Sequence, residues 1–370
     1  MYIKSLKLQN FRNYADELFA FDPAVNLICG ENGQGKTNLL EAAAACSTMR
    51  LFRTAQKKEG LRFGENHAFI FADFLAQERD VSLELRFSRT KAMEIYKNGV
   101  RQKRQSDAQG LLKTVLFCPE DLMLVRAGAA ARRRFLDTAL CQMRPNYARY
   151  LEEYNRLHEH KTRILRDSEE KPSLLSMWED FSLRMAHIGA RIIRYRAYYC
   201  RKLLKAAAAV YADIAPHEVL SGVYKTVSSV TDPFADARTI EKQLIDHVFS
   251  HKTAEIAAKS CLSGPHKDDL ELLLDGRSAA SFGSQGQVRT CTLSLKLAER
   301  ELFFDEDGEY PVLLLDDVLS ELDRRRQDFV LNRISAGQVM ITCCEDGISE
   351  KLRAGAVFHI QNGEKSAETH

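Results

Sequence analysis

The feature that most constrains this sequence is a glycine-rich octapeptide, GENGQGKT, at residues 30–37. An apolar run, Val25 to Cys29, comes directly before it, and Leu39, Leu40 and a run of alanines follow. A buried strand, a glycine-rich turn and a helix in this order form a phosphate-binding loop, because backbone N–H groups and the helix dipole converge on one anion. A chance glycine-rich turn would lack this setting. The octapeptide therefore predicts an α/β fold that binds a nucleotide.

The side chains of the octapeptide have separate expected roles. Lys36 is expected to reach the β- and γ-phosphates and to act in catalysis, and the Thr37 hydroxyl is expected to bind Mg²⁺. The predicted cofactors are therefore ATP and Mg²⁺. The predicted nucleotide-binding residues of this segment are Gly30, Glu31, Asn32, Gly33, Gln34, Gly35, Lys36, Thr37 and Asn38.

A second feature is an apolar strand, Val312 to Leu315, that ends in Asp316 and Asp317. Ligands lie at the carboxyl ends of the strands in an open α/β sheet, so these carboxylates are predicted to face the phosphates. Asp316 is expected to hold Mg²⁺ together with Thr37, and Asp317 to orient or deprotonate the attacking water. A strand followed by an acidic helix cap is the alternative, which the phosphate loop disfavours.

A third feature, Ser284-Gln285-Gly286-Gln287, precedes a helical segment. A serine hydroxyl and a glycine N–H at a helix start can bind an anion, whereas a plain helix cap would use the serine alone. Four residues are weak evidence by themselves. Their place in the order of motifs carries the argument, because they stand between the phosphate loop and the acidic strand end.

This order of motifs resembles the ABC ATPases, whose signature sequence occupies the position of Ser284 to Gln287. Further segments narrow the resemblance to the RecF family, bacterial recombination mediators related to Rad50 and SMC heads. The match runs from Tyr2 to about Cys344. The segments that carry it are Asn10 to Tyr14, Arg132 to Asp137, Ser263 to Asp269 and Ser320 to Asp323.

The resemblance implies an α/β, ABC-type (Rad50-like) ATPase lobe with an inserted, mainly helical second lobe. We expect residues 1–118 and 255–370 to form the ATPase lobe and residues 119–254 to form the helical lobe. The sequence agrees with a helical middle. Apolar residues from Leu174 to Tyr199 follow a heptad-like spacing, which predicts a long helix packed against the helix that begins near Tyr147.

The resemblance also implies an ATP-dependent homodimer. Ser284, Gly286 and Gln287 of one subunit would act in trans on the nucleotide held by Lys36 of the other. Arg12 would contact the nucleotide, and Asp323 would couple the two sites across the interface.

Two departures from common ABC patterns imply slow hydrolysis. An aspartate, Asp317, stands where ABC ATPases commonly have glutamate. The strand Val339 to Cys343 lacks the terminal histidine that is usual in transporter ATPases, with Thr342 or Cys343 in that place. We therefore expect a weak, DNA-stimulated ATPase that acts as a nucleotide switch, with Asp317 and Lys36 as its catalytic residues.

The implied partner is DNA, either duplex, gapped or at single-stranded junctions. Mediator proteins of the RecO and RecR type are further implied partners, with loading of the strand-exchange recombinase during repair and replication restart as the outcome. Net charge is only +2, so DNA contact requires local basic patches. Candidates are Arg50, Arg53, Lys57, Lys58 and Arg62; Arg101, Lys103 and Arg104; and Arg132 to Arg134, each of which can also be an ordinary solvated surface.

Composition excludes other classes of protein. No uncharged apolar run reaches the ~20 residues of a spanning helix, and the start of the chain lacks a secretory signal, so we expect a cytoplasmic protein without a membrane partner. The nine scattered cysteines are expected to be buried thiols without a zinc site. His266, Asp268 and Asp269 are expected to be structural, although they could form a metal site.

Three alternative functions remain for this sequence. They are a transporter ATPase subunit, a P-loop kinase and a scaffold that uses ATP only as a ligand.

Overall fold

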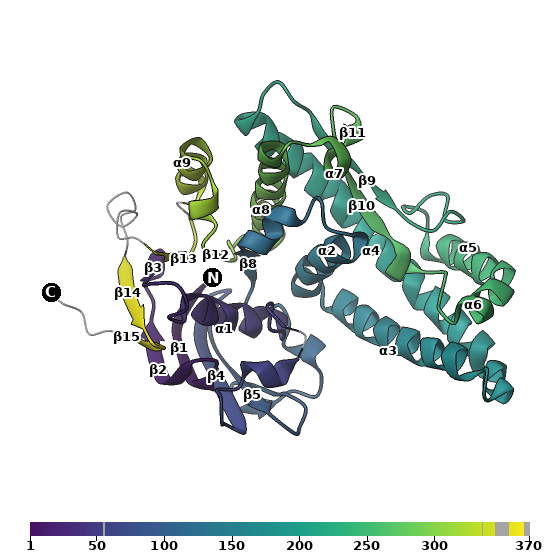
Figure 1. Ribbon diagram of the computed structural model, residues 1–370, viewed down its shortest axis with the longest axis horizontal. Helices are drawn as coiled ribbons and strands as arrows, with labels where there is room; N and C mark the ends of the chain where they lie inside the picture. Colours follow the sequence, from purple (N-terminus) through teal and green to yellow (C-terminus); the bar gives the residue numbers. More distant parts are fainter. Residues whose placement is uncertain (55, 335, 345–354, 366–370) are drawn as a thin grey trace. The chain divides into compact units, whose positions relative to one another are not determined.

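A computed structural model describes residues 1–54, 56–334, 336–344 and 355–365, which fold into two compact units. The first unit comprises Met1–Met123 and Thr292–His370, and the second comprises Leu124–Cys291 (Figure 1). Helix α8 (Gln285–Asp307) begins in the second unit and ends in the first. Among the described helices, none is long and apolar enough to cross a membrane.

The first unit contains two sheets. The antiparallel sheet has the strand order β2-β1-β4-β5-β6-β7 and the other sheet has the order β15-β14-β3-β13-β12-β8, in which the strands from β14 to β8 are parallel. The strands of the antiparallel sheet are β1 (Tyr2–Phe11), β2 (Tyr14–Ala20), β4 (His67–Ala76), β5 (Arg79–Ser88), β6 (Glu94–Lys97) and β7 (Val100–Arg101). Those of the second sheet are β3 (Val25–Cys29), β8 (Thr114–Phe117), β12 (Val312–Leu315), β13 (Val339–Cys343), β14 (Ala356–Gln361) and β15 (Glu364–Lys365).

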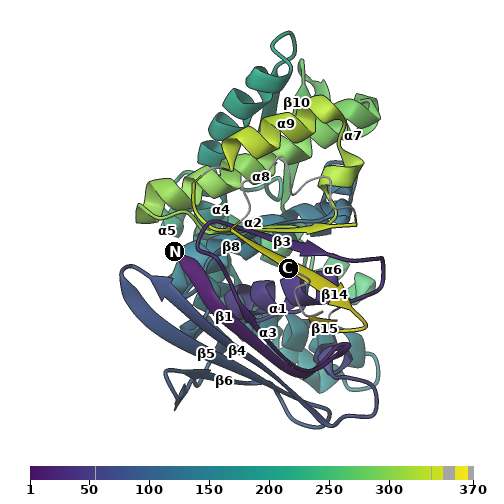
Figure 2. The same cartoon turned by 90° about the vertical axis from the view of Figure 1, so that its left-hand side faces the viewer.

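Helix α1 (Lys36–Thr48) lies between these two sheets (Figures 1 and 2). Its alanines Ala42 to Ala45 are buried in a core that includes residues from β1 and β4 on one side and from β12 and β14 on the other. Small side chains let the helix approach both sheets closely, which explains the alanine run after the phosphate loop. Strands β12 and β13 are buried along their whole length, as expected for parallel strands.

Helices α3 (Pro145–Asp167) and α4 (Trp178–Ile214) dominate the second unit and pack against each other as the heptad-like spacing predicts. Trp178, Met185 and Ile188 of the predicted seam are buried. The other helices of the unit are α2 (Ala129–Met143), α5 (Ala237–Ser250), α6 (Lys252–Ala258) and α7 (Ala279–Phe282). Its strands β9 (Leu220–Lys225), β10 (Asp269–Leu274) and β11 (Arg277–Ser278) form one antiparallel sheet.

The boundary between the units differs from the expected one. The resemblance predicts a return to the ATPase lobe at residue 255, whereas the second unit continues to Cys291. Strand β10 accounts for the difference, because it pairs with β9 of the second unit from Asp269↔Lys225 to Leu274↔Leu220. The second unit therefore carries a small sheet beside its helices, and the segment that begins at Ser263 belongs to it.

Candidate nucleotide site

The phosphate loop connects β3 to α1 and depends on glycine at two crowded positions. Gly30 has φ +148°, and a Cβ atom there would lie 2.4 Å from the carbonyl oxygen of Ile360. Gly35 has φ +123°, and a Cβ atom there would lie 2.6 Å from the side-chain nitrogen of Asn13. Both φ values favour glycine, and both contacts exclude a side chain. Strand β14 and the β1–β2 turn therefore fix the shape of the loop.

The side chain of Lys36 lies along the loop and is almost completely buried. Its Nζ atom donates to the carbonyl oxygens of Gly30 at 2.6 Å and of Glu31 at 3.0 Å. A third contact, at 3.4 Å, is to the Sγ atom of Cys344. The ammonium group thus lies within the phosphate loop, where it can exchange these carbonyl contacts for phosphate oxygens.

Thr37, Asp316 and Thr342 form an oxygen cluster, of which the sequence predicts Thr37 and Asp316. The Thr37 hydroxyl donates to Asp316 Oδ1 at 2.9 Å, and the Thr342 hydroxyl donates to the same oxygen at 3.0 Å. Burial raises the pKa of Asp316, while the bonds from Thr37 and Thr342 oppose this shift. A buried carboxylate beside a hydroxyl is a donor set that suits Mg²⁺, because hard cations prefer oxygen ligands.

Asp317 follows in a left-handed conformation, with φ +50°. Its backbone N–H donates to the Thr342 hydroxyl at 2.8 Å, so Thr342 holds both aspartates at the end of β12. The sequence predicts no role for Thr342 other than its place where a histidine is common. Its position inside a buried strand gave no signal of a contact with the carboxylate.

The turn between β1 and β2 contacts the phosphate loop directly. Asn13 donates to the carbonyl oxygen of Gln34 at 2.7 Å and accepts from the side chain of Asn38 at 2.8 Å. The Tyr14 hydroxyl donates to the carbonyl oxygen of Gly35 at 2.9 Å. Asn13 and Tyr14 lie in the segment Asn10 to Tyr14, on which the resemblance partly rests, but only Arg12 of that segment has a predicted site role.

Two of the three guanidinium nitrogens of Arg12 form hydrogen bonds in the described structure, and the third does not. Nε forms an ion pair with Glu41 at 2.7 Å, and Nη1 donates to the carbonyl oxygen of Glu59 at 2.8 Å. Nη2 is buried and has no hydrogen-bond partner among the residues that the structure describes. A buried donor without a partner costs about 1–3 kcal/mol, so a polar ligand atom would stabilise this arrangement. The expected role of Arg12 in nucleotide binding fits this geometry.

Cys344 is a further residue of this site for which the sequence predicts no role. All nine cysteines are thiols, and eight are buried as expected, but Cys344 is exposed. Besides Lys36, its Sγ atom contacts Asn32 Oδ1 at 3.1 Å and Asp317 Oδ1 at 3.9 Å. The signal was its position directly after the carboxyl end of β13, the strand next to β3 and β12.

The three predicted signature residues lie at the start of α8, in the second unit. The Ser284 N–H donates to Gln287 Oε1 at 2.7 Å, and the Gln287 N–H donates to Ser284 Oγ at 3.2 Å, which is a reciprocal capping box. The Gly286 carbonyl accepts from Thr290. The cap satisfies the helix start locally, and the action of Ser284, Gly286 and Gln287 on a partner's nucleotide stays a prediction.

Asp323 lies in the first unit as the N-cap of α9 (Arg324–Arg333). Its carboxylate accepts from the Arg326 N–H at 3.0 Å and forms an ion pair with the Arg326 guanidinium. The side chain is half exposed, so it keeps access to solvent. Its expected role at a subunit interface stays a prediction.

His266, Asp268 and Asp269 have separate partners. His266 Nδ1 lies 2.7 Å from the Tyr154 hydroxyl, and burial lowers the pKa of this histidine to about 3. Asp268 pairs with buried Arg196, and Asp269 forms a two-bond ion pair with Arg132. Within the described part of the chain, no group of three such side chains could hold a metal ion. These contacts support a structural role for the three residues, which stays a prediction.

The basic clusters differ in their partners. Arg132 and Arg133 bond to Asp269 and to the Asp268 carbonyl, so they stabilise the second unit from within. Arg101 forms an ion pair with Glu94. Residues 50–62 form the remaining cluster, and their exposed basic side chains are Arg50, Arg53, Lys58 and Arg62.

Known proteins match this chain over nearly its whole length. The family model of the RecF/RecN/SMC N-terminal domain matches residues 2–366. The DNA replication and repair protein RecF of Bacillus cytotoxicus is 37% identical over 373 residues, which cover 100% of this chain and 99% of that protein. RecF of Acetivibrio thermocellus is 34% identical over 361 residues, which cover 98% of each chain.

Solved structures give the same result. A structure of the recombination mediator protein RecF with ATP, in the RecFOR pathway, has a TM-score of 0.91 and 32% identity, and the match covers 99% of this chain and 98% of that one. The Smc head domain of Pyrococcus furiosus has a TM-score of 0.56 at 15% identity, over 99% of this chain and 95% of that one, which shows the shared fold. The expected fold class, an ABC-type ATPase, is therefore confirmed.

Proposed function

Because this chain belongs to the RecF family of DNA replication and repair proteins, we propose that it is an ATP-dependent recombination mediator that binds duplex and gapped DNA as an ATP-induced homodimer. With mediator proteins of the RecO and RecR type, it helps to load the strand-exchange recombinase during repair and replication restart in the cytoplasm. The family relationship argues against a transporter subunit and against a kinase.

The observation that carries the ATP-dependent part is the phosphate loop with its oxygen cluster. Lys36 lies within the loop, and Thr37 bonds to Asp316 at 2.9 Å. The buried orphan nitrogen of Arg12 supports a nucleotide ligand independently of the loop. When Mg²⁺ is bound, it neutralises charge on the β- and γ-phosphates, and Thr37 with Asp316 would hold it.

Slow hydrolysis follows from the groups near the attacking water. Asp317 is the expected base, and its side chain is shorter than the glutamate that is common in ABC ATPases. The side chain at the end of β13 that contacts both Lys36 and Asp317 is the thiol of Cys344, which is a weak hydrogen-bonding group compared with histidine. We propose that ATP binding switches DNA affinity and that DNA stimulates the slow turnover that resets the switch.

The composite site is the second part of the proposal. Ser284, Gly286 and Gln287 at the start of α8 would complete the nucleotide site of a second subunit, and Asp323 would lie at the interface. A helix start with a serine cap supports this role, because its N–H groups and dipole favour a phosphate. Two copies related by a two-fold axis would then bind two ATP molecules between them.

DNA binding tests the proposal. Fluorescence anisotropy on a gapped duplex is measured with ATP, with ADP and without nucleotide, for the wild type and for Lys36→Met and Ser284→Arg. ATP is expected to tighten binding by at least about tenfold, or ~1.4 kcal/mol, and both variants should lose this effect. Lys171→Met and Ser173→Arg are matched controls, because both residues are exposed in the second unit.

Two outcomes contradict the proposal. DNA binding that ignores the nucleotide would remove the proposed function, and so would the absence of any DNA binding. Unchanged DNA affinity after complete ATP turnover would instead support a scaffold that uses ATP only as a ligand.

A further inference from the structure

The segment of residues 50–65 is unusually basic for this chain. It holds five basic and two acidic residues, a net charge of +3, whereas the whole chain has +2. Its backbone is fastened to the end of β1 at two places. The Arg12 N–H donates to the carbonyl oxygen of Gly60 at 2.8 Å, and the Arg62 N–H donates to that of Asn10 at 2.8 Å. The turn that follows Arg62 therefore starts from a fixed position.

Phe63 stands at the corner of this turn. The Glu65 N–H donates to the carbonyl oxygen of Arg62 at 3.0 Å, and Gly64 has φ +87°, which is the pattern of a type II turn with Phe63 at its second position. The Phe63 side chain is fully exposed. Burying a phenylalanine side chain stabilises a fold by about 1.5–3 kcal/mol. Phe63 does not contribute this free energy, because the turn holds its ring in solvent.

Basic groups flank the ring on both sides of the turn. Arg62 precedes it, and Arg89 lies against its end, where the Arg89 guanidinium donates to the carbonyl oxygen of Glu65 at 3.1 Å. Lys58, Arg62 and Arg89 are exposed. An exposed aromatic ring among cations suits a single-stranded nucleic acid, because each base offers an apolar face and each phosphate a negative charge.

The segment is also connected to the phosphate loop's helix. Glu41, fully buried on α1, accepts from the Arg53 N–H at 3.1 Å and from Arg12 Nε at 2.7 Å. The Arg53 guanidinium donates to Asn38 at 3.1 Å, and Arg12 donates to the carbonyl oxygen of Glu59. A nucleotide that engages Arg12 or Asn38 would thus act on contacts that hold this segment.

We propose that Phe63 is a stacking site for an unpaired nucleobase and that Lys58, Arg62 and Arg89 bind the phosphates around it. This inference rests on the proposed DNA-binding function and names the part of the surface that recognises the single-stranded side of a gap. Bases inside an intact duplex are already stacked on each other, so Phe63 gives no advantage there. It supplies a preference for gapped over intact DNA.

The test compares DNA probes that differ only in the gap. Phe63→Ala is measured by fluorescence anisotropy with ATP on a gapped duplex, on the same duplex with abasic sites throughout the gap, and on an intact duplex. We expect about 5- to 150-fold weaker binding to the gapped duplex, corresponding to ~1–3 kcal/mol of stacking per base, and no change on the other two probes. The wild type should bind the duplex with the abasic gap about as weakly as Phe63→Ala binds the ordinary gapped duplex.

Three further variants separate stacking from other effects. Phe63→Trp should keep the preference for the gap, and Leu18→Ala, which truncates an exposed apolar side chain on β2, should leave all affinities unchanged. Arg62→Gln should weaken binding to all three probes by similar factors and reduce the salt dependence, because it removes a phosphate contact.

The outcomes that overturn the inference are distinct from failure of the proposed function. Equal affinities of Phe63→Ala and the wild type for the gapped duplex, with ATP-dependent DNA binding intact, refute the stacking site alone. Equal weakening of Phe63→Ala binding on all three probes also refutes the stacking site. Loss of ATP-dependent self-association in Phe63→Ala would assign the ring to a contact between subunits instead. A wild type that binds no DNA refutes both proposals.

Discussion

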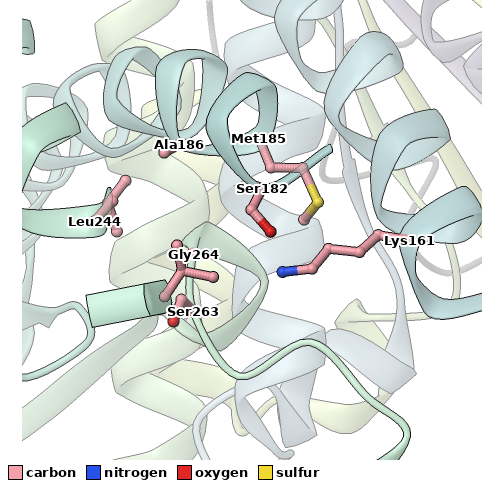
Figure 3. A pocket seen from close by; sticks show the side chains of 8 residues that line it. Lys161, Ser182, Met185, Ala186, Leu244, Ser263 and Gly264 are labelled. Atoms are coloured by element: carbon pink, nitrogen blue, oxygen red, sulfur yellow. The ribbon is translucent and has the colours of Figure 1, made fainter. Parts of the chain in front are cut away.

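We expect Glu255→Gln to destabilise the second unit strongly, because it removes one charge from a buried ion pair. Lys161 on α3 and Glu255 on α6 are both almost completely buried, and Lys161 Nζ lies 2.6 Å from Glu255 Oε2. The same carboxylate accepts from the indole N–H of Trp178 at 3.1 Å and from the Leu262 N–H at 2.7 Å. Figure 3 shows Lys161 extending toward Ser182 and Gly264, which line the same small pocket.

The size of the effect follows from this burial. Removing one partner of a buried pair costs about 3–5 kcal/mol, because the other charge stays in a site without water. With a urea dependence of roughly 2 kcal/mol per molar, the unfolding midpoint should fall by about 2 M. Lys161→Met should have a smaller effect, since Trp178 and Leu262 still donate to the carboxylate. The double variant should be less destabilised than the sum of both, because no isolated charge remains.

Trp178 provides the assay. It is the only tryptophan of the chain, and its fluorescence in a urea titration of the full-length protein reports the unfolding of the cluster itself. Glu169→Gln is the control, because Glu169 forms an exposed ion pair with Lys259 that solvent screens. If Glu255→Gln lowers the midpoint no more than Glu169→Gln does, the charge of Glu255 does not stabilise the fold and the reasoning is refuted.

Three other predictions concern the nucleotide site and the second unit. N-ethylmaleimide should modify exposed Cys344 before the other cysteines and block ATP binding, and bound ATP should slow this reaction. The Cys344→Ser variant should still bind ATP after the same treatment. Mass spectrometry that finds another cysteine modified first would contradict this prediction. Asp316→Asn should lower Mg²⁺-dependent ATP hydrolysis about 100-fold or more, because a bound cation supplies several kcal/mol of charge stabilisation, whereas unchanged turnover would exclude Asp316 as a ligand. Burial lowers the pKa of His266 to about 3, below an unfolded value of about 6.5, so its contribution to stability is complete above pH 6.5 and is lost as the pH falls toward 3, by up to ~1.4 kcal/mol per pH unit. Between pH 7 and pH 5, the wild type should therefore lose more stability than His266→Gln. Asp268, whose pKa is raised to about 6 mainly by burial, has the opposite effect, but it is present in both proteins and its effect drops out of the comparison. Equal losses of stability in the two proteins would contradict the assignment.

The phosphate loop could be predicted because its information is local. Strand, turn and helix are contiguous in the sequence, and the apolar run of β12 placed Asp316 at the correct end of the parallel sheet. The contact between Thr37 and Asp316 spans 279 positions of sequence, yet it follows from the rule that strand ends meet at one edge. Long-range contacts of this kind can be predicted when both residues occupy special positions of a regular sheet.

Other parts of the site depend on contacts that no local pattern encodes. Asn13 and Tyr14 hold the phosphate loop through a turn between two strands, and their residue types are ordinary for turns and cores. Thr342 is a polar residue in a buried strand, and only the structure shows its bonds to both aspartates. The same limit explains the domain boundary, because β10 has the alternating pattern of any half-buried strand and the pattern does not name its partner, β9.

Mixing two inactive variants tests the central claim, the composite site, most directly. Lys36→Met and Ser284→Arg each remove one half of both sites in a homodimer, but a mixed dimer keeps one intact pair, Lys36 of one subunit with Ser284 of the other. An equimolar mixture should therefore recover roughly a quarter of the ATP-stimulated binding to gapped DNA, since half of the dimers are mixed and each has one of two sites. Binding in the mixture that stays at the level of the separate variants would contradict the account, because it would mean that Lys36 and Ser284 must act within one chain.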